Sequence, residues 1–221
     1  MTDIKTVALF DLSRTLASQQ LAQTLYPFEA LAYIKEWILS IGKQLDPARF
    51  VQNAPDVWIA QSARISPAAL IAGPCIIDED TEVRHGAFIR GNVLVGKGAV
   101  VGNSTELKNA ILFDGVQVPH YNYVGDSILG YRAHMGAGAV TSNVKGNKSC
   151  IVIKNGAEHI DTGRKKVGAF LGDHTEIGCG CVLNPGTVIG VGTQVYPLIS
   201  VRGVLPPDCI CKDTDTVIKR K

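Results

Sequence analysis

Aliphatic residues recur at every sixth position along the first half of the chain. They are Ile59, Ile65, Ile71, Ile77, Val83, Ile89, Val95, Val101 and Leu107. From Ile65 onward a small side chain stands two positions earlier, at Ala63, Ala69, Cys75, Thr81, Ala87, Val93, Ala99 and Thr105. An α-helix repeats at 3.6 residues and a strand at 2, whereas a parallel β-helix built of hexapeptides keeps a six-residue phase. The pattern predicts an all-β solenoid, a left-handed parallel β-helix of about seven coils with about 18 residues in each triangular turn.

The six-residue phase is interrupted in the second half of the chain. It slips by one residue between Leu107 and Leu112, slips again before Leu129, and is lost between about residues 143 and 166. It then resumes at Leu171 in phase with Met135. We therefore expect the β-helix to span residues 58–212, with residues 144–166 extruded from it as a loop or arm.

Residues 1–57 follow a different pattern. A run of good helix formers follows residues 11–15, and apolar residues at near-helical spacing follow Pro27 and end near Gly42. We expect a helical cap on the exposed end of the first coil, or a region that packs in an oligomer, since terminal repeats of solenoids need covering. A docking or substrate-gating element is the alternative. The short tail, residues 213–221, ends in charged residues and is expected to fray.

Composition narrows the function classes. The 221 residues are 46% hydrophobic with 23 Gly and a formal charge of +2, which gives no basic face for nucleic acid. No signal-like segment and no long uncharged apolar run occurs, so we expect a cytoplasmic protein without a membrane span.

Six cysteines lack the paired spacing of a zinc site, and Cys75 and Cys181 occupy the small-residue position of the repeat. We expect no metal site.

Three ordered motifs give a family resemblance. They are Glu106-Leu107-Lys108-Asn109, Pro119-His120-Tyr121-Asn122-Tyr123-Val124-Gly125-Asp126-Ser127, and Met135-Gly136-Ala137-Gly138-Ala139-Val140-Thr141-Ser142-Asn143. Over residues 58–212 the chain resembles the C-terminal acetyltransferase domain of bifunctional UDP-N-acetylglucosamine pyrophosphorylase/glucosamine-1-phosphate acetyltransferases. Residues 160–170 are more similar to the archaeal sugar-1-phosphate nucleotidyltransferase/acetyltransferase branch. Those enzymes also carry a Rossmann-like nucleotidyltransferase domain, which 57 helical residues cannot contain, so uridylyl transfer is not expected.

The resemblance implies acetyl transfer from acetyl-CoA to the amine of an amino-sugar phosphate or a nucleotide-sugar precursor. The amine must be neutral to attack a thioester, and an imidazole with a pKa of about 6.5 suits the base that deprotonates it. His120 matches the family's catalytic histidine. Arg90 and Lys108 match its phosphate-binding pair, and Tyr123 and Asn143 match positions that hold the sugar. His134 stands beside the reacting group, where the family usually has Asn.

The cofactor is implied in the same way. Family enzymes bind acetyl-CoA in the groove between adjacent β-helices of a trimer, and Ala137, Asp173, Val191 and Arg202 are the positions expected near it. Main-chain N–H groups at the turn of Ala137, between Gly136 and Gly138, are expected to stabilise the oxyanion. A homotrimer is therefore expected.

One part of this site follows from spacing alone. Arg90 and Lys108 are three hexads apart, which is one full turn, so they should stack on one face in neighbouring coils about 5 Å apart. A planar guanidinium and an ammonium together suit a phosphate dianion. Solvated charges on a solenoid wall are the simpler interpretation of either residue alone.

Two other function classes remain open. A non-catalytic or regulatory paralogue that binds a sugar nucleotide would keep the pocket without turnover, because a fold does not fix a function. A metal enzyme resembling γ-class carbonic anhydrases uses the same fold, but His120 and His134 lack the spacing that three converging imidazoles require.

Overall fold

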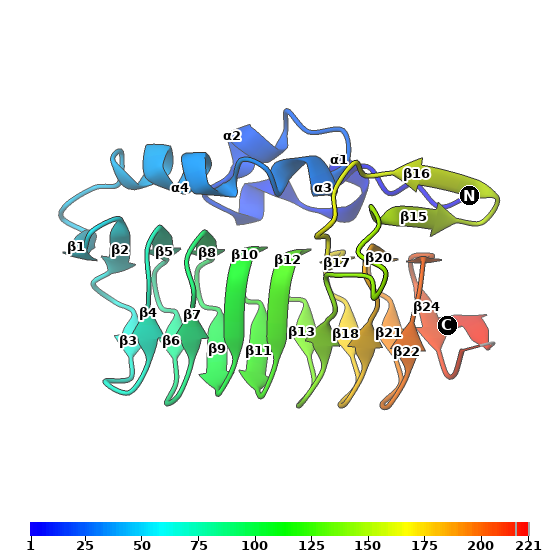
Figure 1. Ribbon diagram of the computed structural model, residues 1–221. Coiled ribbons are helices and arrows are strands. Elements are labelled where there is room, and N and C mark those ends of the chain that lie inside the picture. The colour runs from blue at the N-terminus through cyan, green and yellow to red at the C-terminus, as the bar shows by residue number, and fades with distance from the viewer. Residues whose placement is uncertain (215, 221) are drawn as a thin grey trace.

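The chain forms a parallel β-helix of stacked coils with a layer of short helices along one side (Figure 1). The computed structural model describes residues 1–214 and 216–220. Each coil contributes strands to three walls, and the aliphatic residues of the six-residue repeat fill the prism between them, as Ile77, Val95 and Leu107 show at 0% exposure. The predicted solenoid is confirmed.

The first wall, which we call the covered wall, lies beneath the helices. Its strands are β2 (Val57–Ala60), β5 (Cys75–Ile77), β8 (Val93–Val95), the ends of β10 (Glu106–Leu112) and β12 (Tyr123–Leu129), β17 (Ala169–Leu171), β20 (Thr187–Ile189) and β23 (Val204–Leu205). At its outer edge β1 (Phe50–Ala54) pairs antiparallel with β2.

The second wall adjoins the covered wall, and β10 and β12 run from the second wall into the covered wall. It holds β4 (Leu70–Ile71), β7 (Phe88–Ile89), the starts of β10 and β12, β14 (Val140–Thr141), β19 (Val182–Leu183) and β22 (Ser200–Val201).

The third wall is a nine-stranded sheet. Its strands are β3 (Arg64–Ile65), β6 (Glu82–Val83), β9 (Val100–Asn103), β11 (Gln117–His120), β13 (His134–Met135), β18 (Glu176–Ile177), β21 (Gln194–Val195), β24 (Cys209–Cys211) and β25 (Val217–Lys219). All pair in parallel except β25, which pairs antiparallel with β24. The tail expected to fray therefore forms a strand over residues 217–219, while residues 215 and 221 lie outside the described part.

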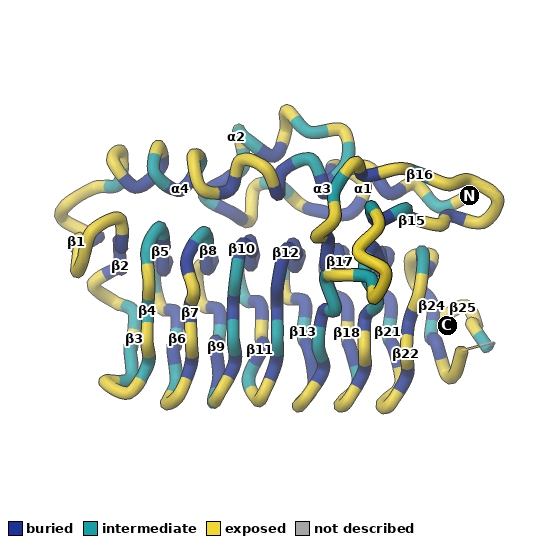
Figure 2. Tube along the Cα trace, viewed as in Figure 1, coloured by how far each residue is buried: buried dark blue, intermediate teal, exposed yellow. Residues whose placement is uncertain are grey.

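The N-terminal helices cover a side of the solenoid, and the predicted cap on its first coil is wrong. They are α1 (Thr6–Leu9), a 3-10 turn η1 (Leu12–Arg14), α2 (Ser18–Leu21), α3 (Pro27–Ala30) and α4 (Ile34–Gly42). Figure 2 shows a buried seam between this layer and the covered wall. Ile34, Ile38 and Ile41 recur at helical spacing and are buried there, and Gly42 is needed because any side chain would collide with the ring of Trp58.

The outward residues of the covered wall explain this placement. In each strand the residue between two inward-pointing ones faces out, and here these outward residues are apolar and buried. They are Trp58, Ile76, Leu94, Ile111, Ile128, Phe170 and Val188. A wall that is apolar on both faces must be covered, and burying it contributes more than covering one coil end.

The two phase slips correspond to shortened corners between the second and covered walls. Successive coils are 18 residues apart at Cys75 and Val93 but 17 apart at Val93, Ala110 and Ser127. At these corners Asn109 and Asp126 take left-handed backbone conformations with φ of 50° and 49°, so β10 and β12 bend without a loop. Each slip thus places a short polar side chain at a tight corner.

The predicted arm is an antiparallel hairpin of β15 (Val152–Asn155) and β16 (Glu158–Asp161). It leaves the solenoid after Asn143 and lies beside the N-terminus (Figure 1). Asn155 holds it there, because its amide donates to the carbonyl of Thr2 at 2.8 Å and its oxygen accepts from the Thr2 N–H at 3.2 Å. No helix in the described residues is long and apolar enough to cross a membrane.

Candidate active site

The second wall brings the predicted phosphate residues together. The Arg90 N–H donates to the carbonyl of Leu107 at 2.9 Å, so Arg90 lies one coil away from Lys108, as the spacing predicted. Each cation already faces a carboxylate. Arg90 donates to Glu106 at 2.7 Å and lies 6.0 Å from the centre of the Phe88 ring, whereas Lys108 pairs with Asp126 at 3.1 Å.

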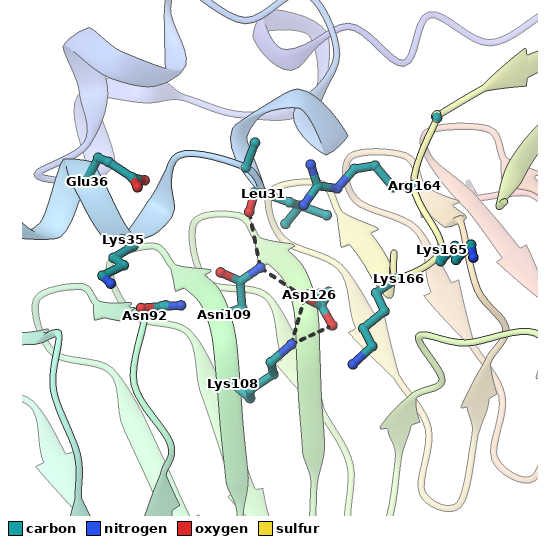
Figure 3. Close-up of a pocket in the computed structure, with 12 residues that line it drawn as sticks. Leu31, Lys35, Glu36, Asn92, Lys108, Asn109, Asp126, Arg164, Lys165 and Lys166 are labelled. Carbon is teal, nitrogen blue, oxygen red and sulfur yellow. Dashed lines mark hydrogen bonds and ion pairs between the residues drawn. The ribbon is translucent and has the colours of Figure 1, made fainter. Parts of the chain in front are cut away.

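Asp126 is the centre of the polar network on this wall (Figure 3). Its side chain is 4% exposed and accepts from three donors: Lys108 Nζ at 3.1 Å, Asn109 Nδ2 at 2.9 Å and Asn143 Nδ2 at 2.6 Å. Asn109 also donates to the main-chain carbonyl of Leu31, which ties the network to the helical layer at 3.2 Å. A buried carboxylate is stable when all its partners are present. The sequence motif contained Asp126, but no role was predicted for it.

Tyr123 and Asn143 lie beside this carboxylate. Asn143 Nδ2 is 3.2 Å from the Tyr123 hydroxyl oxygen, so the two predicted sugar-binding residues are in contact. Partial burial, together with the nearby Asp126 charge, raises the pKa of Tyr123, which keeps the phenol protonated. The phenol therefore remains a hydrogen-bond donor for a ligand on this wall.

His120 lies at the other end of the same wall, at the corner where the third wall turns into the second. It ends β11, its side chain is exposed, and its ring forms no hydrogen bond within the described residues. Residues 121 and 122 form the turn, and Tyr123 then begins β12. The imidazole is therefore free to contact a ligand that lies along the wall from Tyr123.

The same corner of the next coil carries Ala137. The His120 carbonyl accepts from the Gly138 N–H at 3.0 Å, which fixes the two coils against each other. Ala137 is exposed, and its own N–H has no acceptor among the described residues. A free main-chain N–H one coil from an exposed imidazole is the arrangement expected of an oxyanion donor beside a general base.

Asn122 positions both groups. Its side chain is buried, accepts from the His120 N–H at 3.1 Å, and donates to the carbonyls of Gly136 at 2.8 Å and Ala139 at 3.1 Å. The amide thus clamps the turn of His120 to the turn of Ala137. No role was predicted for Asn122, although it stands two residues after His120 and two residues before the repeat residue Val124, where the repeat places a short side chain.

His134 lies away from the second wall. It begins β13 on the third wall, where Nδ1 is 2.8 Å from Glu176 Oε2 and register pairs it with Gln117. Its side chain therefore points from a different wall than Lys108, Tyr123 and Asn143. The structure does not place His134 beside the other predicted acceptor residues within one protomer.

The predicted cofactor residues are spread over three corners. Asp173 accepts from the Asp11 and Tyr131 N–H groups, both at 2.7 Å, so its carboxylate fastens the N-terminal segment to the β-helix. Burial raises its pKa. Val191 lies at the same corner one coil on, and the exposed Arg202 follows β22 on the second wall.

None of these three residues lies at the corner of Ala137. In the next coil that corner carries Cys179. The Ala137 carbonyl accepts from Gly180 at 2.9 Å, and the Cys179 carbonyl accepts from Leu198 at 2.9 Å. Cys179 is exposed, unlike Cys75 and Cys181, which are buried as predicted. This alignment of Ala137 with Cys179 can be read from the sequence, because Cys179 stands two residues after the repeat residue Ile177, as Ala137 stands two residues after Met135. The described residues contain no group of three His, Cys, Asp or Glu side chains that could hold a metal ion.

Comparisons with known proteins agree with the motifs. A family model described as the GMPPB C-terminal domain matches residues 71–157. A bifunctional sugar-1-phosphate nucleotidylyltransferase/acetyltransferase of Sulfurisphaera tokodaii is 31% identical over 184 residues, which cover 74% of this chain and 44% of that protein. A putative uncharacterized acetyltransferase of Escherichia coli K12, YaiX, is 28% identical over 155 residues, covering 70% and 67%.

A bifunctional protein GlmU of Methanococcus maripaludis is 33% identical over 109 residues, covering 49% of this chain and 26% of that protein. The chain therefore spans less than half the length of both bifunctional relatives. By its motifs and by these matches, the chain resembles the acetyltransferase part of bifunctional sugar-1-phosphate nucleotidylyltransferase/acetyltransferases.

Proposed function

We propose that this protein is an acetyl-CoA-dependent N-acetyltransferase that acts on an amino-sugar phosphate or a nucleotide-linked amino sugar. One observation carries the proposal: the second wall runs from the cations Arg90 and Lys108, past Tyr123, to an exposed imidazole and a free N–H. That order matches an acceptor with a phosphate at one end and an amine at the other. Acetyl-CoA would supply the thioester whose carbonyl carbon is attacked.

His120 is the proposed general base. The neutral amine nitrogen attacks the thioester carbonyl carbon, and His120 takes the proton that the nitrogen loses as the C–N bond forms. The Ala137 N–H stabilises the oxygen that becomes negative in the tetrahedral intermediate. When the C–S bond breaks, the thiolate of coenzyme A leaves and takes a proton from the imidazolium, which restores neutral His120.

Arg90 and Lys108 are the proposed phosphate ligands. A dianion between them would compete with Glu106 and Asp126 for the two cations, and planar Arg90 offers a bidentate contact. Tyr123 and Asn143 are placed to bind sugar hydroxyls between the phosphate and the amine. His134 would reach an acceptor only from another protomer, because it faces out from the third wall.

A homotrimer is part of the proposal. His120 and Ala137 lie on a convex corner, so a neighbouring β-helix is needed to exclude water and complete a groove for the cofactor. Tyr121 and Leu198 are 64% and 83% exposed at this corner, which suits an interface between copies. Asp173 offers no free carboxylate oxygen here, so we assign the thioester end of the cofactor to Ala137 and Cys179, with Val191 and Arg202 left for its distal part.

A thiol-release assay tests the function. Acetyl-CoA is incubated with glucosamine 1-phosphate, galactosamine 1-phosphate and uridine-diphosphate-linked amino sugars, and free coenzyme A is measured. We expect release that depends on the acceptor and is lost in His120→Ala. Absence of release with every acceptor would reject the enzyme.

A non-catalytic sugar-nucleotide-binding protein is the second candidate. One observation favours it: Arg90 and Lys108 are already paired with carboxylates of the protein, those of Glu106 and Asp126. Calorimetry distinguishes the two candidates only when turnover is measured with the same ligands: binding without release would support the second candidate.

A further inference from the structure

A cavity of about 620 Å³ lies at the upper end of the second wall, between the helical layer and the base of the hairpin arm. Figure 3 shows the residues that line it, with Asn109 and Asp126 near their middle. It is lined by Leu31, Ala32, Lys35, Glu36, Asn92, Lys108, Asn109, Asp126, Gly163, Arg164, Lys165 and Lys166. Three separate parts of the chain, namely the helices, the second wall and the arm, thus line one open cavity that includes Lys108.

The lining has an excess of positive charge. The only lining carboxylates are Asp126 and Glu36, against four lysines and one arginine, and Asp126 already accepts from three donors. Lys35 and Lys166 have no carboxylate partner among the described residues, whereas Lys108 already has one. Unpaired cations from facing elements repel one another, so their convergence indicates an anionic ligand.

Arg164 gives an independent indication. Its Nε atom is buried, yet it has no hydrogen-bond partner among residues 1–214 and 216–220. Buried polar atoms in native proteins are nearly always paired, and a guanidinium suits phosphate oxygens in particular. Figure 3 shows the Arg164 side chain extending toward Leu31, over the cavity.

The length of the wall indicates how large the anion is. Tyr123 and Asp126 are three residues apart along β12, which is about 10 Å of extended chain, and His120 lies beyond Tyr123. In a hexosamine 1-phosphate the amine and the phosphate are on neighbouring ring carbons, so a single phosphate reaches Arg90 or Lys108 but leaves the cavity empty. A volume of about 620 Å³ is in the range of sites for ligands of nucleotide size.

We propose that the cavity binds the nucleoside diphosphate end of a nucleotide-linked amino sugar. This inference rests on the proposed function and names its acceptor class. The amino sugar lies along Tyr123 with its amine at His120, the sugar-linked phosphate meets Arg90 and Lys108, and the second phosphate with its nucleoside enters between Lys35, Arg164 and Lys166.

Calorimetry on the full chain tests the cavity without any turnover. Uridine, guanosine and thymidine diphosphates are titrated into the wild type, Lys35→Ala, Arg164→Ala and the matched control Lys43→Ala, an exposed lysine at the end of the same helix α4. We expect at least one diphosphate to bind, with affinity lowered about tenfold to a hundredfold in Lys35→Ala and Arg164→Ala, the scale of a lost charge-assisted bond. Lys43→Ala should match the wild type.

Two further probes identify the source of the anion. Hexosamine 1-phosphate affinity should be unchanged in Lys35→Ala, because a single phosphate does not reach that side chain. Adenosine 3′,5′-bisphosphate, the nucleotide part of coenzyme A, should bind Lys35→Ala and wild type equally. An effect of Lys35→Ala on the bisphosphate alone would overturn the inference and assign the cavity to the cofactor.

The inference and the proposed function fail separately. Failure of every nucleoside diphosphate to bind, or equal losses in Lys35→Ala and Lys43→Ala, overturns the inference even when acetyl transfer to a hexosamine 1-phosphate is observed. Diphosphate binding that depends on Lys35, with no transfer to any acceptor, supports the cavity and rejects the enzyme.

Discussion

Replacing Asp126 by Asn should destabilise the protein by about 3 kcal/mol. Asparagine keeps the size of the side chain and tolerates the left-handed backbone at this corner, where φ is 49°. What changes is the charge: the ion pair with Lys108 at 3.1 Å is lost, and an NH₂ group replaces an oxygen that accepted from Asn143 or Asn109. A hydrogen bond to a charged group contributes about 1.5–3 kcal/mol, and Lys108, at 28% exposure, regains only part of its hydration.

The assay is differential scanning calorimetry. For a chain of this length, 1 kcal/mol corresponds to about 2–4 °C, so the melting temperature should fall by about 6–12 °C. The matched control is Asp56→Asn, which has the same substitution and a φ of 58° but an exposed side chain, and we expect it to melt within about 2 °C of wild type.

A double-mutant cycle isolates the pair. Lys108→Met combined with Asp126→Asn should cost less than the sum of the single changes, because each single change already breaks the same contact. Equal melting temperatures for Asp126→Asn and Asp56→Asn would refute the argument that Asp126 organises this wall.

Three further outcomes are expected. His120→Ala should lower turnover about 10²–10⁴-fold without changing the melting temperature, since its exposed ring makes no hydrogen bond with the described residues; an unchanged rate would exclude His120 as the base. Arg90→Ala should weaken acceptor binding about tenfold to a hundredfold in calorimetry, and unchanged affinity would mean that Arg90 is only a solvated charge on the wall. Burial raises the pKa of Asp78 to about 6, so folding favours its protonated form; wild-type stability should fall by about 2–3 kcal/mol as pH rises from 4 to 6, and Asp78→Asn should abolish that fall in melts across this range.

The solenoid could be predicted because its repeat is imposed by one spatial demand. Every inward position of a triangular coil must be apolar, and that demand appears in the sequence with a fixed period. The position of the helices was missed although its signal was present. Ile76, Leu94 and Ile111 stand one position before the repeat residues Ile77, Val95 and Leu112, and their apolar character marked one wall as covered.

The parts of the candidate site that follow the coil repeat could be predicted from the sequence. The parts that depend on contacts at the corners were missed. One full turn separates Arg90 from Lys108, so spacing alone placed them in neighbouring coils. Asn122 and Asp126 act through hydrogen bonds that form only when coils stack, and a linear sequence does not show which carbonyls they meet. His134 was expected beside the reacting group, but its wall is set by the turn that precedes it.

The reversed strands at the two ends of the solenoid protect two of its sheet edges. A parallel coil exposes an edge that another coil, or another molecule, can extend indefinitely, as in a growing fibre. Here β1 covers the edge of the covered wall at one end and β25 covers the edge of the third wall at the opposite end, and both run against the direction of the coils. A reversed strand does not offer the parallel pairing that joins the coils, and β25 ends in Lys219, next to Arg220, so positive charge also disfavours a second copy at this edge. The two reversed strands therefore block edge-to-edge extension of these two walls by another parallel coil.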